Sequence, residues 1–225
     1  MLTGAGISVA SGLETYRGND SKKNNIEQLA HIDRFQDNPL AVWEVFNSLR
    51  EKSIAAKPNK IHRLLADIES KIQGEFTIIT QNVDRLHHRG GSNNVVELHG
   101  RIDITCCSNS ECKLQPYFDD KVYLAEAPIC PLCNSPLRPS VTLFGEFVPL
   151  DCEWQAKKAL RNCDLFVAIG TSGTVFPAVN YVRSAEYVGA RTIFVNLEPI
   201  DPPNPYFKEE YIGKAENILP KLFSF

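Results

Sequence analysis

The 225-residue sequence lacks several features that would assign its class at once. No apolar run approaches the ~18 residues of a membrane-spanning helix, so we expect no membrane partner. The formal net charge is only −3, which gives no bulk attraction to nucleic acid or to anionic lipid. Internal repeats, low-complexity tracts and a recognisable signal peptide are also missing. These absences favour an ordinary globular protein without a nucleic-acid partner.

Cysteine is the residue type whose distribution is most informative. Seven cysteines are present, and five of them lie between residues 106 and 133. A disulfide framework is typical of shorter, secreted chains, whereas this clustering indicates metal binding in a reducing compartment. We therefore expect a cytoplasmic protein, with mitochondrial or nuclear locations as alternatives, and we expect a monomer. Cys152 and Cys163 stand apart and are interpreted as small core or helix-face residues.

The spacing within the cluster matches a zinc ribbon. Cys107 and Cys112 are separated by four residues, and Cys130 and Cys133 by two. Four thiolates would fill a tetrahedral zinc shell and leave no position open, so the predicted role of the metal is structural. Cys106 is an alternative first ligand, and unligated thiols are the alternative for the whole cluster. Zinc binding would supply folding free energy that this weakly apolar segment otherwise lacks.

Several short apolar runs end in a polar or glycine-rich cluster, which is typical of buried parallel strands. They span residues 76–79, 95–98, 165–169 and 192–195, and Leu2 begins a shorter one. Amphipathic segments lie between them, over residues 61–72, 154–162 and 175–188. This alternation predicts a doubly wound α/β domain, in which ligands bind at the carboxyl ends of the strands.

Two segments interrupt the alternation and are interpreted as insertions. Residues 19–60 are helical in part, and residues 101–138 carry the cysteine cluster. The sequence thus predicts one large α/β domain formed by residues 1–18, 61–100 and 139–225, a helical insertion, and a small zinc-ribbon module.

Two glycine-containing turns could hold phosphate groups. Gly4 and Gly6 are the first two glycines of a G-x-G-x-x-G fingerprint, but Val9 stands where the third glycine belongs. An ordinary tight turn between a strand and a helix is the alternative. Residues 170–173 form a second such turn after another predicted strand, so both turns could face one crevice.

His99 is the histidine that the strand pattern places at a carboxyl end, beside the polar clusters. A neutral imidazole there could act as a general base, although a polar residue that closes a strand is the simpler interpretation. We expect the other histidines to be structural or solvated, with the adjacent pair exposed on the surface. They are His31, His62 and the pair His87 and His88.

Several short motifs follow one another in a fixed order over nearly the whole chain. They are Gly4-Ala5-Gly6-Ile7-Ser8, Tyr16-Arg17-Gly18, Thr80-Gln81-Asn82-Val83-Asp84, His99-Gly100, the paired cysteines, Phe144-Gly145-Glu146, Gly170-Thr171-Ser172 and Asn196-Leu197-Glu198-Pro199. Each motif alone is modest, but the ordered set is specific. In this order they resemble the sirtuin family of NAD-dependent protein deacylases.

The resemblance implies a Rossmann-like domain that binds NAD, with an acyl-lysine of a protein substrate entering beside the zinc-bearing module. It implies that His99 is the catalytic base, that Asn82 orients the ribose, and that nicotinamide and O-acyl-ADP-ribose are released. Positions that match cofactor contacts are Gly4, Ala5, Gly6, Ser8, Tyr16, Arg17, Gln81, Asn82, Asp84, Gly170, Thr171, Ser172, Asn196, Glu198 and Ala215. Positions that match substrate contacts are Thr15, Phe46, Leu49, Val141, Phe144 and Gly145, with backbone pairing along residues 141–144.

At Thr15 the chain resembles the branch of the family that removes succinyl and malonyl groups. That branch holds the acyl carboxylate with a tyrosine and an arginine, but the matching positions here are Phe46 and Leu49. Arg50 comes next, yet one residue along a helix turns by ~100°, so we expect its side chain to face away. A buried carboxylate without a cationic partner is costly. We therefore predict a preference for neutral acyl groups, from acetyl to longer aliphatic chains.

Three alternative functions stay open. A desuccinylase or demalonylase would need another cation in the acyl pocket. A mono-ADP-ribosyltransferase or NAD hydrolase would use the same cofactor cleft with a different acceptor. A zinc-ribbon module that binds protein or nucleic acid belongs to a different class. Its nucleic-acid version would need a basic, aromatic face, whereas residues 101–138 carry near-balanced charge.

Overall fold

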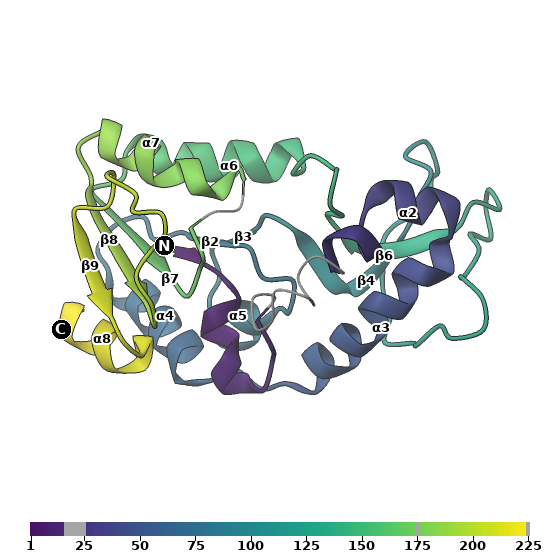
Figure 1. Ribbon diagram of the computed structural model, residues 1–225, viewed down its shortest axis with the longest axis horizontal. Helices are drawn as coiled ribbons and strands as arrows, with labels where there is room; N and C mark the ends of the chain where they lie inside the picture. The colour runs from purple at the N-terminus through teal and green to yellow at the C-terminus, as the bar shows by residue number, and fades with distance from the viewer. Residues whose placement is uncertain (16–25, 174–175, 224–225) are drawn as a thin grey trace.

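Two sheets organise the computed structural model, which describes residues 1–15, 26–173 and 176–223 (Figure 1). The larger sheet has six parallel strands in the order β3-β2-β1-β7-β8-β9. Its strands are β1 (Leu2–Thr3), β2 (Ile78–Thr80), β3 (Val95–Glu97), β7 (Leu165–Ile169), β8 (Arg191–Asn196) and β9 (Glu209–Ile212). The strand order reverses between β1 and β7, and such a reversal opens a crevice at the carboxyl ends of the strands.

Helices cover both faces of this sheet and also the second, smaller sheet. The named helices are α2 (Ile32–Asp37), α3 (Pro39–Ala55), α4 (Lys60–Lys71), α5 (Leu86–Arg89), α6 (Leu150–Arg161), α7 (Tyr181–Tyr187) and α8 (Ala215–Leu222), with 3-10 segments η1 (Ala5–Ser11) and η2 (Ala178–Asn180). The helix predicted over residues 154–162 starts earlier, at Leu150. The helix predicted over residues 175–188 begins only at Tyr181, after a 3-10 turn capped by Pro177. No helix in the described part of the chain has the length and apolar character of a bilayer span.

Alternate side chains of the central strand β7 face opposite helical layers. Phe166 and Ala168 pack in one core with residues of α6 and α7, while Val167 and Ile169 pack in another with residues of α4 and α8. All four side chains are at most 2% exposed, as expected for a strand covered on both faces. Figure 1 shows the two helix pairs above and below the sheet. The predicted doubly wound α/β fold is confirmed.

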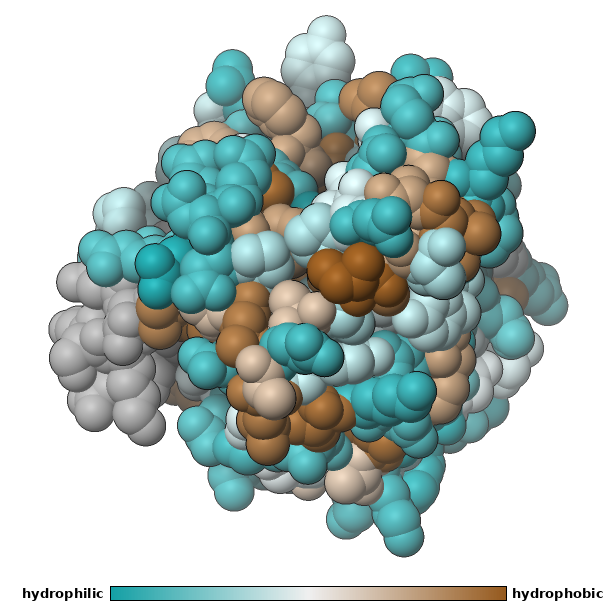
Figure 2. Space-filling view, turned by 90° about the vertical axis from the view of Figure 1, so that its right-hand side faces the viewer, coloured by the Kyte–Doolittle hydropathy of each residue, from teal (hydrophilic) through white to brown (hydrophobic). Residues whose placement is uncertain are grey.

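The smaller sheet lies to the right of the large sheet in Figure 1, and Figure 2 shows the molecule from this side, where hydrophobic patches stand among a mostly hydrophilic surface. It is antiparallel, in the order β5-β4-β6, with strands β4 (Gly100–Cys107), β5 (Tyr117–Phe118) and β6 (Leu137–Val141). Helices α2 and α3 cover it, and Phe46 of α3 packs in one buried cluster with Ile102 and Val141. Because β4 begins at Gly100 and β6 continues to Val141, this sheet extends slightly beyond residues 101–138 on both sides.

Four cysteine sulfurs gather in this small module. The Sγ atoms of Cys107, Cys112, Cys130 and Cys133 all lie within 4.8 Å of one another. Tetrahedral zinc with Zn–S bonds of about 2.3 Å places its sulfurs about 3.8 Å apart, so the four residues fit this metal. Cys106 does not join the cluster, because consecutive residues of β4 point to opposite faces of the sheet. Zinc bound here would tie the two cysteine-bearing loops together.

The side chain of Arg50 connects helix α3 to the zinc module. It is fully buried, and its guanidinium lies 3.2 Å from the carboxylate of Asp119. It also donates to the carbonyl oxygen of Ile102 at 2.9 Å and to Thr105 Oγ1 at 3.0 Å. The guanidinium carbon lies 4.7 Å from the ring centroid of Trp43. A buried cation with this set of partners fixes one arrangement of the helix and the module.

His62 and His87 form a buried pair, so the prediction that His87 is exposed was wrong. The two residues are 0% and 2% exposed, and their ring centroids lie 5.1 Å apart. His62 Nδ1 accepts the backbone N–H of Asn59, and His87 Nε2 lies 2.9 Å from Thr3 Oγ1. Among the described residues, the second ring nitrogen of each histidine has no partner. Burial lowers the pKa of His62 to about 4, and burial with the neighbouring imidazoles lowers the pKa of His87 to about 3.

Because both imidazoles are neutral in the fold, mild acid should destabilise the protein. An unfolded histidine has a pKa of about 6.5, so between that value and about 4 the unfolded chain binds more protons than the folded chain. The stability contributed by the neutral rings is complete above pH ~6.5 and falls as the pH decreases through this window. The expected slope is about 1.4 kcal/mol per pH unit for each histidine, and urea denaturation at several pH values measures it.

His62→Gln is the matched variant, because glutamine keeps an acceptor at the third helical position but does not titrate in this range. We expect its unfolding free energy to depend less steeply on pH than that of the unchanged protein. The same slope in both proteins would show that burial of His62 does not control the acid sensitivity.

Removal of one thiolate should release the metal. We expect about one zinc ion per chain by elemental mass spectrometry, and its loss in Cys130→Ser, whose side chain is fully buried. Cys106→Ser is the matched control, because Cys106 adjoins the cluster without joining it, and this variant should keep its zinc. Zinc retained by Cys130→Ser, or lost from Cys106→Ser, would contradict the ligand assignment.

Candidate functional site

The carboxyl ends of β1 and β7 meet at glycine residues. The N–H of Gly6 donates to the carbonyl oxygen of Gly170 at 2.8 Å, and the N–H of Gly4 donates to Ile169 at 3.1 Å. A Cβ atom on Gly4 or Gly6 would lie only 2.8 Å from the carbonyl oxygen of Gly170. Gly170 itself has a φ of +58°, in the left-handed region that favours glycine. The two turns predicted to hold phosphate, with Ala5 between the first two glycines, therefore lie against each other.

Three polar side chains form a buried hydrogen-bond chain beside the first turn. Asn82 Nδ2 donates to the carbonyl oxygen of Gly4 and to Ser8 Oγ, both at 3.2 Å. Ser8 Oγ donates in turn to the carboxylate of Asp84 at 2.6 Å. Burial raises the pKa of Asp84, while the hydrogen bonds from Ser8 and from the N–H of Leu86 oppose this rise. The network fixes Asn82 and Asp84, from the segment after β2, relative to the turn after β1.

His99 lies just beyond the carboxyl end of β3. Its Nδ1 is 3.0 Å from the carbonyl oxygen of Gln81. A carbonyl oxygen can only accept, so Nδ1 carries the hydrogen and Nε2 presents a lone pair. Burial lowers the pKa of His99, and the bond to Gln81 opposes this only in part. The ring is therefore neutral near pH 7 and can accept a proton at Nε2.

A second network joins the ends of β2, β7 and β8. Thr171 Oγ1 donates to the side-chain oxygen of Gln81 at 2.8 Å, and Asn196 Nδ2 donates to the carbonyl oxygen of Thr171 at 3.3 Å. Ser172 follows Thr171 in the same turn and is half-buried. The residues predicted to contact a nucleotide from β2, β7 and β8 thus form one continuous polar edge.

The remaining predicted cofactor positions lie further along the chain. Glu198 is exposed in the segment after β8, and Ala215 is the first residue of α8. Thr15 is exposed and is the last residue described before the first gap. Tyr16 and Arg17 lie outside the described residues.

The predicted acyl pocket has an apolar wall on α3. Phe46 is buried and Leu49 is partly buried, and both pack in the cluster that contains Val141 of β6. Arg50 follows Leu49, but its guanidinium is turned into the zinc module and bonded there, as predicted from the helical rotation. Arg50, the cation nearest in sequence to Phe46 and Leu49, is therefore already paired with Asp119.

Phe144 and Gly145 lie just beyond β6, against α2. The N–H of Phe144 donates to Ala30, and its carbonyl oxygen accepts from the N–H of Ile32 at 2.9 Å. Gly145 has a φ of +85°, and a Cβ atom there would lie 2.6 Å from the ring of His31. The left-handed φ favours glycine at this position, and a side chain there would also displace the ring of His31.

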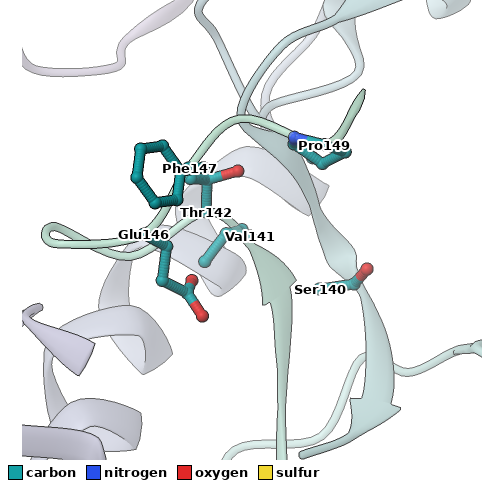
Figure 3. Close-up of a pocket in the computed structure, with 7 residues that line it drawn as sticks. Ser140, Val141, Thr142, Glu146, Phe147 and Pro149 are labelled. Atoms are coloured by element: carbon teal, nitrogen blue, oxygen red, sulfur yellow. The ribbon is translucent and has the colours of Figure 1, made fainter. Parts of the chain in front are cut away.

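A cleft of about 460 Å³ opens beside β6, and Figure 3 shows the side chains around it. It is lined by Gly100, Ser140, Val141, Thr142, Glu146, Phe147 and Pro149. Arg138 holds the carboxylate of Glu146 through two bonds of 2.6 and 2.7 Å, so the loop after β6 has one defined conformation. Phe147 was not predicted as a site residue, although it is a large apolar residue that directly follows the motif Phe144-Gly145-Glu146.

Comparisons with known proteins agree with this geometry. A model of the Sir2 family matches residues 4–177. The chain is similar to the NAD-dependent protein deacylase of Vibrio cholerae, with 40% identity over 99% of this chain and 90% of that protein. It is also similar to NAD-dependent protein deacylase 2 of Archaeoglobus fulgidus, with 38% identity over 99% of this chain and 88% of that protein.

Solved structures lead to the same family. The crystal structure of a Sir2 homologue in complex with NAD has a TM-score of 0.87 and 34% identity, over 98% of this chain and 86% of that chain. A Sir2 structure with a deacetylated p53 peptide and 3′-O-acetyl-ADP-ribose has a TM-score of 0.85 and 31% identity, over 98% of this chain and 90% of that chain. The resemblance to sirtuins is confirmed, and the chain belongs to the Sir2 family.

Proposed function

We propose that this chain removes acyl groups from lysine side chains of proteins and transfers them to the ADP-ribose part of NAD, with uptake of one water molecule, so that free lysine, nicotinamide and O-acyl-ADP-ribose are released. The neutral imidazole of His99 at the strand ends, with Nδ1 on the carbonyl of Gln81 and Nε2 able to accept a proton, is the observation that carries this proposal. The bacterial relative and the archaeal relative are both named NAD-dependent protein deacylases, which supports the proposal.

The strand order reverses between β1 and β7, and a doubly wound sheet binds a dinucleotide at the strand ends beside such a reversal. Side chains on Gly4 or Gly6 would collide with Gly170, so glycine at these positions lets the two turns pack against each other at the strand ends, where a pyrophosphate would bind. NAD bound here would supply the ribose carbon that receives the acyl oxygen, with nicotinamide as the leaving group. Asn82 and Asp84, fixed by Ser8, would orient the ribose and the nicotinamide amide.

His99 would act as the general base. An imidazole whose pKa is lowered by burial stays neutral near pH 7 and can take up a proton released during acyl transfer. The carbonyl oxygen of Gln81 selects the tautomer in which Nε2 is the accepting atom. The same carbonyl then holds the imidazolium by accepting from Nδ1.

The acyl pocket should favour neutral groups. The wall formed by Phe46 and Leu49 is apolar, and Arg50 is committed to Asp119 and to the backbone of β4. A succinyl carboxylate would lose its water here without gaining a guanidinium. Protein substrates are expected to bind through backbone pairing, while a cytoplasmic location and a monomeric state stay predictions from the sequence.

The proposal is tested with NAD and one peptide that carries acetyl-, decanoyl- or succinyl-lysine. We expect O-acyl-ADP-ribose from the two neutral acyl groups by mass spectrometry, and a fall in kcat of at least about 100-fold in His99→Ala, because a general base is lost. His88→Ala is the matched control, since His88 is a partly exposed histidine of α5 to which no cofactor or substrate contact is assigned, and it should retain activity.

A faster reaction with succinyl-lysine than with acetyl-lysine would contradict the predicted acyl preference. Steady nicotinamide release without any acyl product would instead favour ADP-ribosyl transfer or NAD hydrolysis in the same cleft.

A further inference from the structure

The 3-10 helix η1 (Ala5–Ser11) directly follows β1 and is seven residues long. The hydrogen bonds of a 3-10 helix are less well aligned than those of an α-helix, so runs of more than three or four residues are uncommon. A run of this length therefore needs support from other parts of the chain. Gly4 caps η1 and Gly6 lies within it, and both pack against Gly170, so the position of η1 determines the shape of the proposed cofactor site.

The end of η1 next to β1 is supported through Thr3. Thr3 is the last residue of β1 and is fully buried, and its Oγ1 lies 2.9 Å from Nε2 of His87. Gly4 follows directly, with its N–H bonded to Ile169 and its carbonyl oxygen to Asn82. Figure 1 shows η1 in purple beside α5, the helix that carries His87. The hydroxyl of Thr3 thus joins the end of β1 to α5.

The other end of η1 is supported through Asn59, the residue that caps α4. Asn59 Nδ2 donates to the carbonyl oxygen of Ile7 at 2.7 Å and to Ser11 Oγ at 3.0 Å. Asn59 is itself held by His62, whose Nδ1 accepts the N–H of Asn59 at 3.3 Å. Because the ring centroids of His62 and His87 lie only 5.1 Å apart, one buried pair of histidines supports both ends of η1.

The packing of the fold does not require histidine at these two positions. Each ring is buried and has one nitrogen without a partner among the residues that the structure describes. A buried polar atom without a partner destabilises a folded protein, and leucine would fill a similar volume without such an atom. In the described part of the chain no third metal-ligating side chain joins the pair, so a metal does not explain it either. The bonds of the histidines to Thr3 and Asn59 do.

We propose that His87 is a positioning residue for the cofactor site, acting through Thr3, and that His62 supports the same site through Asn59. A hydrogen bond is directional and fixes the orientation of the strand end, whereas an apolar contact in its place only fills the volume. A turn that is already held in its binding geometry loses less conformational freedom when a ligand binds, so the ligand binds more tightly. This role rests on the NAD-dependent function proposed above and adds two buried residues to those that set the cofactor affinity.

The test is the binding of ADP-ribose to the full chain, measured by isothermal titration calorimetry. His87→Leu removes the bond between His87 and Thr3, and so does Thr3→Val, which keeps the shape of the side chain. We expect each change to raise the Kd about tenfold, and we expect the double variant to have the same Kd as either single variant, because one bond is lost in all three. His87→Gln, whose amide can still bond to Thr3 Oγ1, should have a Kd within about threefold of that of the unchanged protein.

Urea denaturation of the same variants separates positioning from a loss of stability. Each single change leaves a buried polar group without its partner and should lower the unfolding free energy, whereas the double variant removes both partners and should recover most of it. The affinity of the double variant for ADP-ribose should not recover. If a single variant fails to fold, the double variant decides. An affinity that returns together with the stability would assign the pair a purely structural role and overturn the proposal.

The role of His62 is tested in the same way. His62→Leu loses the acceptor for the N–H of Asn59 and should raise the Kd of ADP-ribose about threefold, while His62→Gln keeps an acceptor and should bind like the unchanged protein. An unchanged Kd in His62→Leu would overturn the role of His62. Tyr181→Phe is the matched control, because it removes a buried hydroxyl without a partner among the described residues from the core cluster on the other face of the large sheet. Weaker binding in this control would contradict a specific role of the histidine pair.

Failure of the deacylase function is recognised separately. In assays with NAD and an acetyl-lysine peptide, the KM for NAD should rise about tenfold in His87→Leu, with little change in kcat or in the KM for the peptide. If the unchanged protein binds ADP-ribose but does not deacylate the peptide, the deacylase function fails and calorimetry still decides the role of His87. An equal Kd of ADP-ribose in His87→Leu, Thr3→Val and the unchanged protein would overturn that role alone. No binding of ADP-ribose by the unchanged protein would overturn both.

Discussion

The N–H of Gly6 donates to the carbonyl oxygen of Gly170 at 2.8 Å, and the two backbones are so close that a Cβ atom on Gly6 would lie 2.8 Å from the Cα and the carbonyl oxygen of Gly170. Strand β1 has only two residues, so this bond and the one from Gly4 extend the pairing of β1 with β7 beyond the strand itself. Asn82 is bonded to the carbonyl oxygen of Gly4, and Asp84 to the side chain of Ser8. The polar groups of the crevice thus take their positions from a contact between two backbones, and a shift of either turn would move all of them.

His99 is held from both sides of the crevice. Its ring is bonded to the carbonyl oxygen of Gln81 in the large sheet, while its own carbonyl oxygen accepts the N–H of Thr142 beyond β6. The next residue, Gly100, has a φ of +76° and begins β4, and a Cβ atom there would lie 2.2 Å from the carbonyl oxygen of Ser140. The proposed base therefore stands at the junction of the two sheets, where a change in their relative position would alter its orientation.

Much of the fold could be predicted because its signals are local. The apolar run from Leu165 to Ile169 is buried on both faces and is a central parallel strand, as its composition indicated. The cysteine spacing predicted a four-sulfur cluster, and the alternation of side chains along β4 explains why Cys107 rather than Cys106 joins it. Turns rich in glycine marked the strand ends.

The features that were missed depend on contacts between distant parts of the chain. His87 is buried because α5 packs against α4 and β1, and a short polar segment gives no local sign of this. The ion pair of Arg50 with Asp119 joins residues that are far apart in sequence. The cleft beside β6 depends on how the loop with Glu146 is clamped by Arg138. Hydrophobic pattern and motif spacing report on residues that are close in the sequence. The contacts of His87, Arg50 and Arg138 form only when distant segments come together in the folded chain.

Helix α3 contributes to two parts of the molecule. Phe46 and Leu49 form the apolar wall of the proposed acyl pocket, while the side chain of Arg50 enters the zinc module. A zinc module taken from a relative without an acidic residue at the position of Asp119 would leave Arg50 buried beside no counter-ion. In a chimera between relatives, the module and α3 must therefore be exchanged as one unit. The part of the chain that we propose to tune acyl preference is then inherited together with the part that holds the metal, although the sequence separates them.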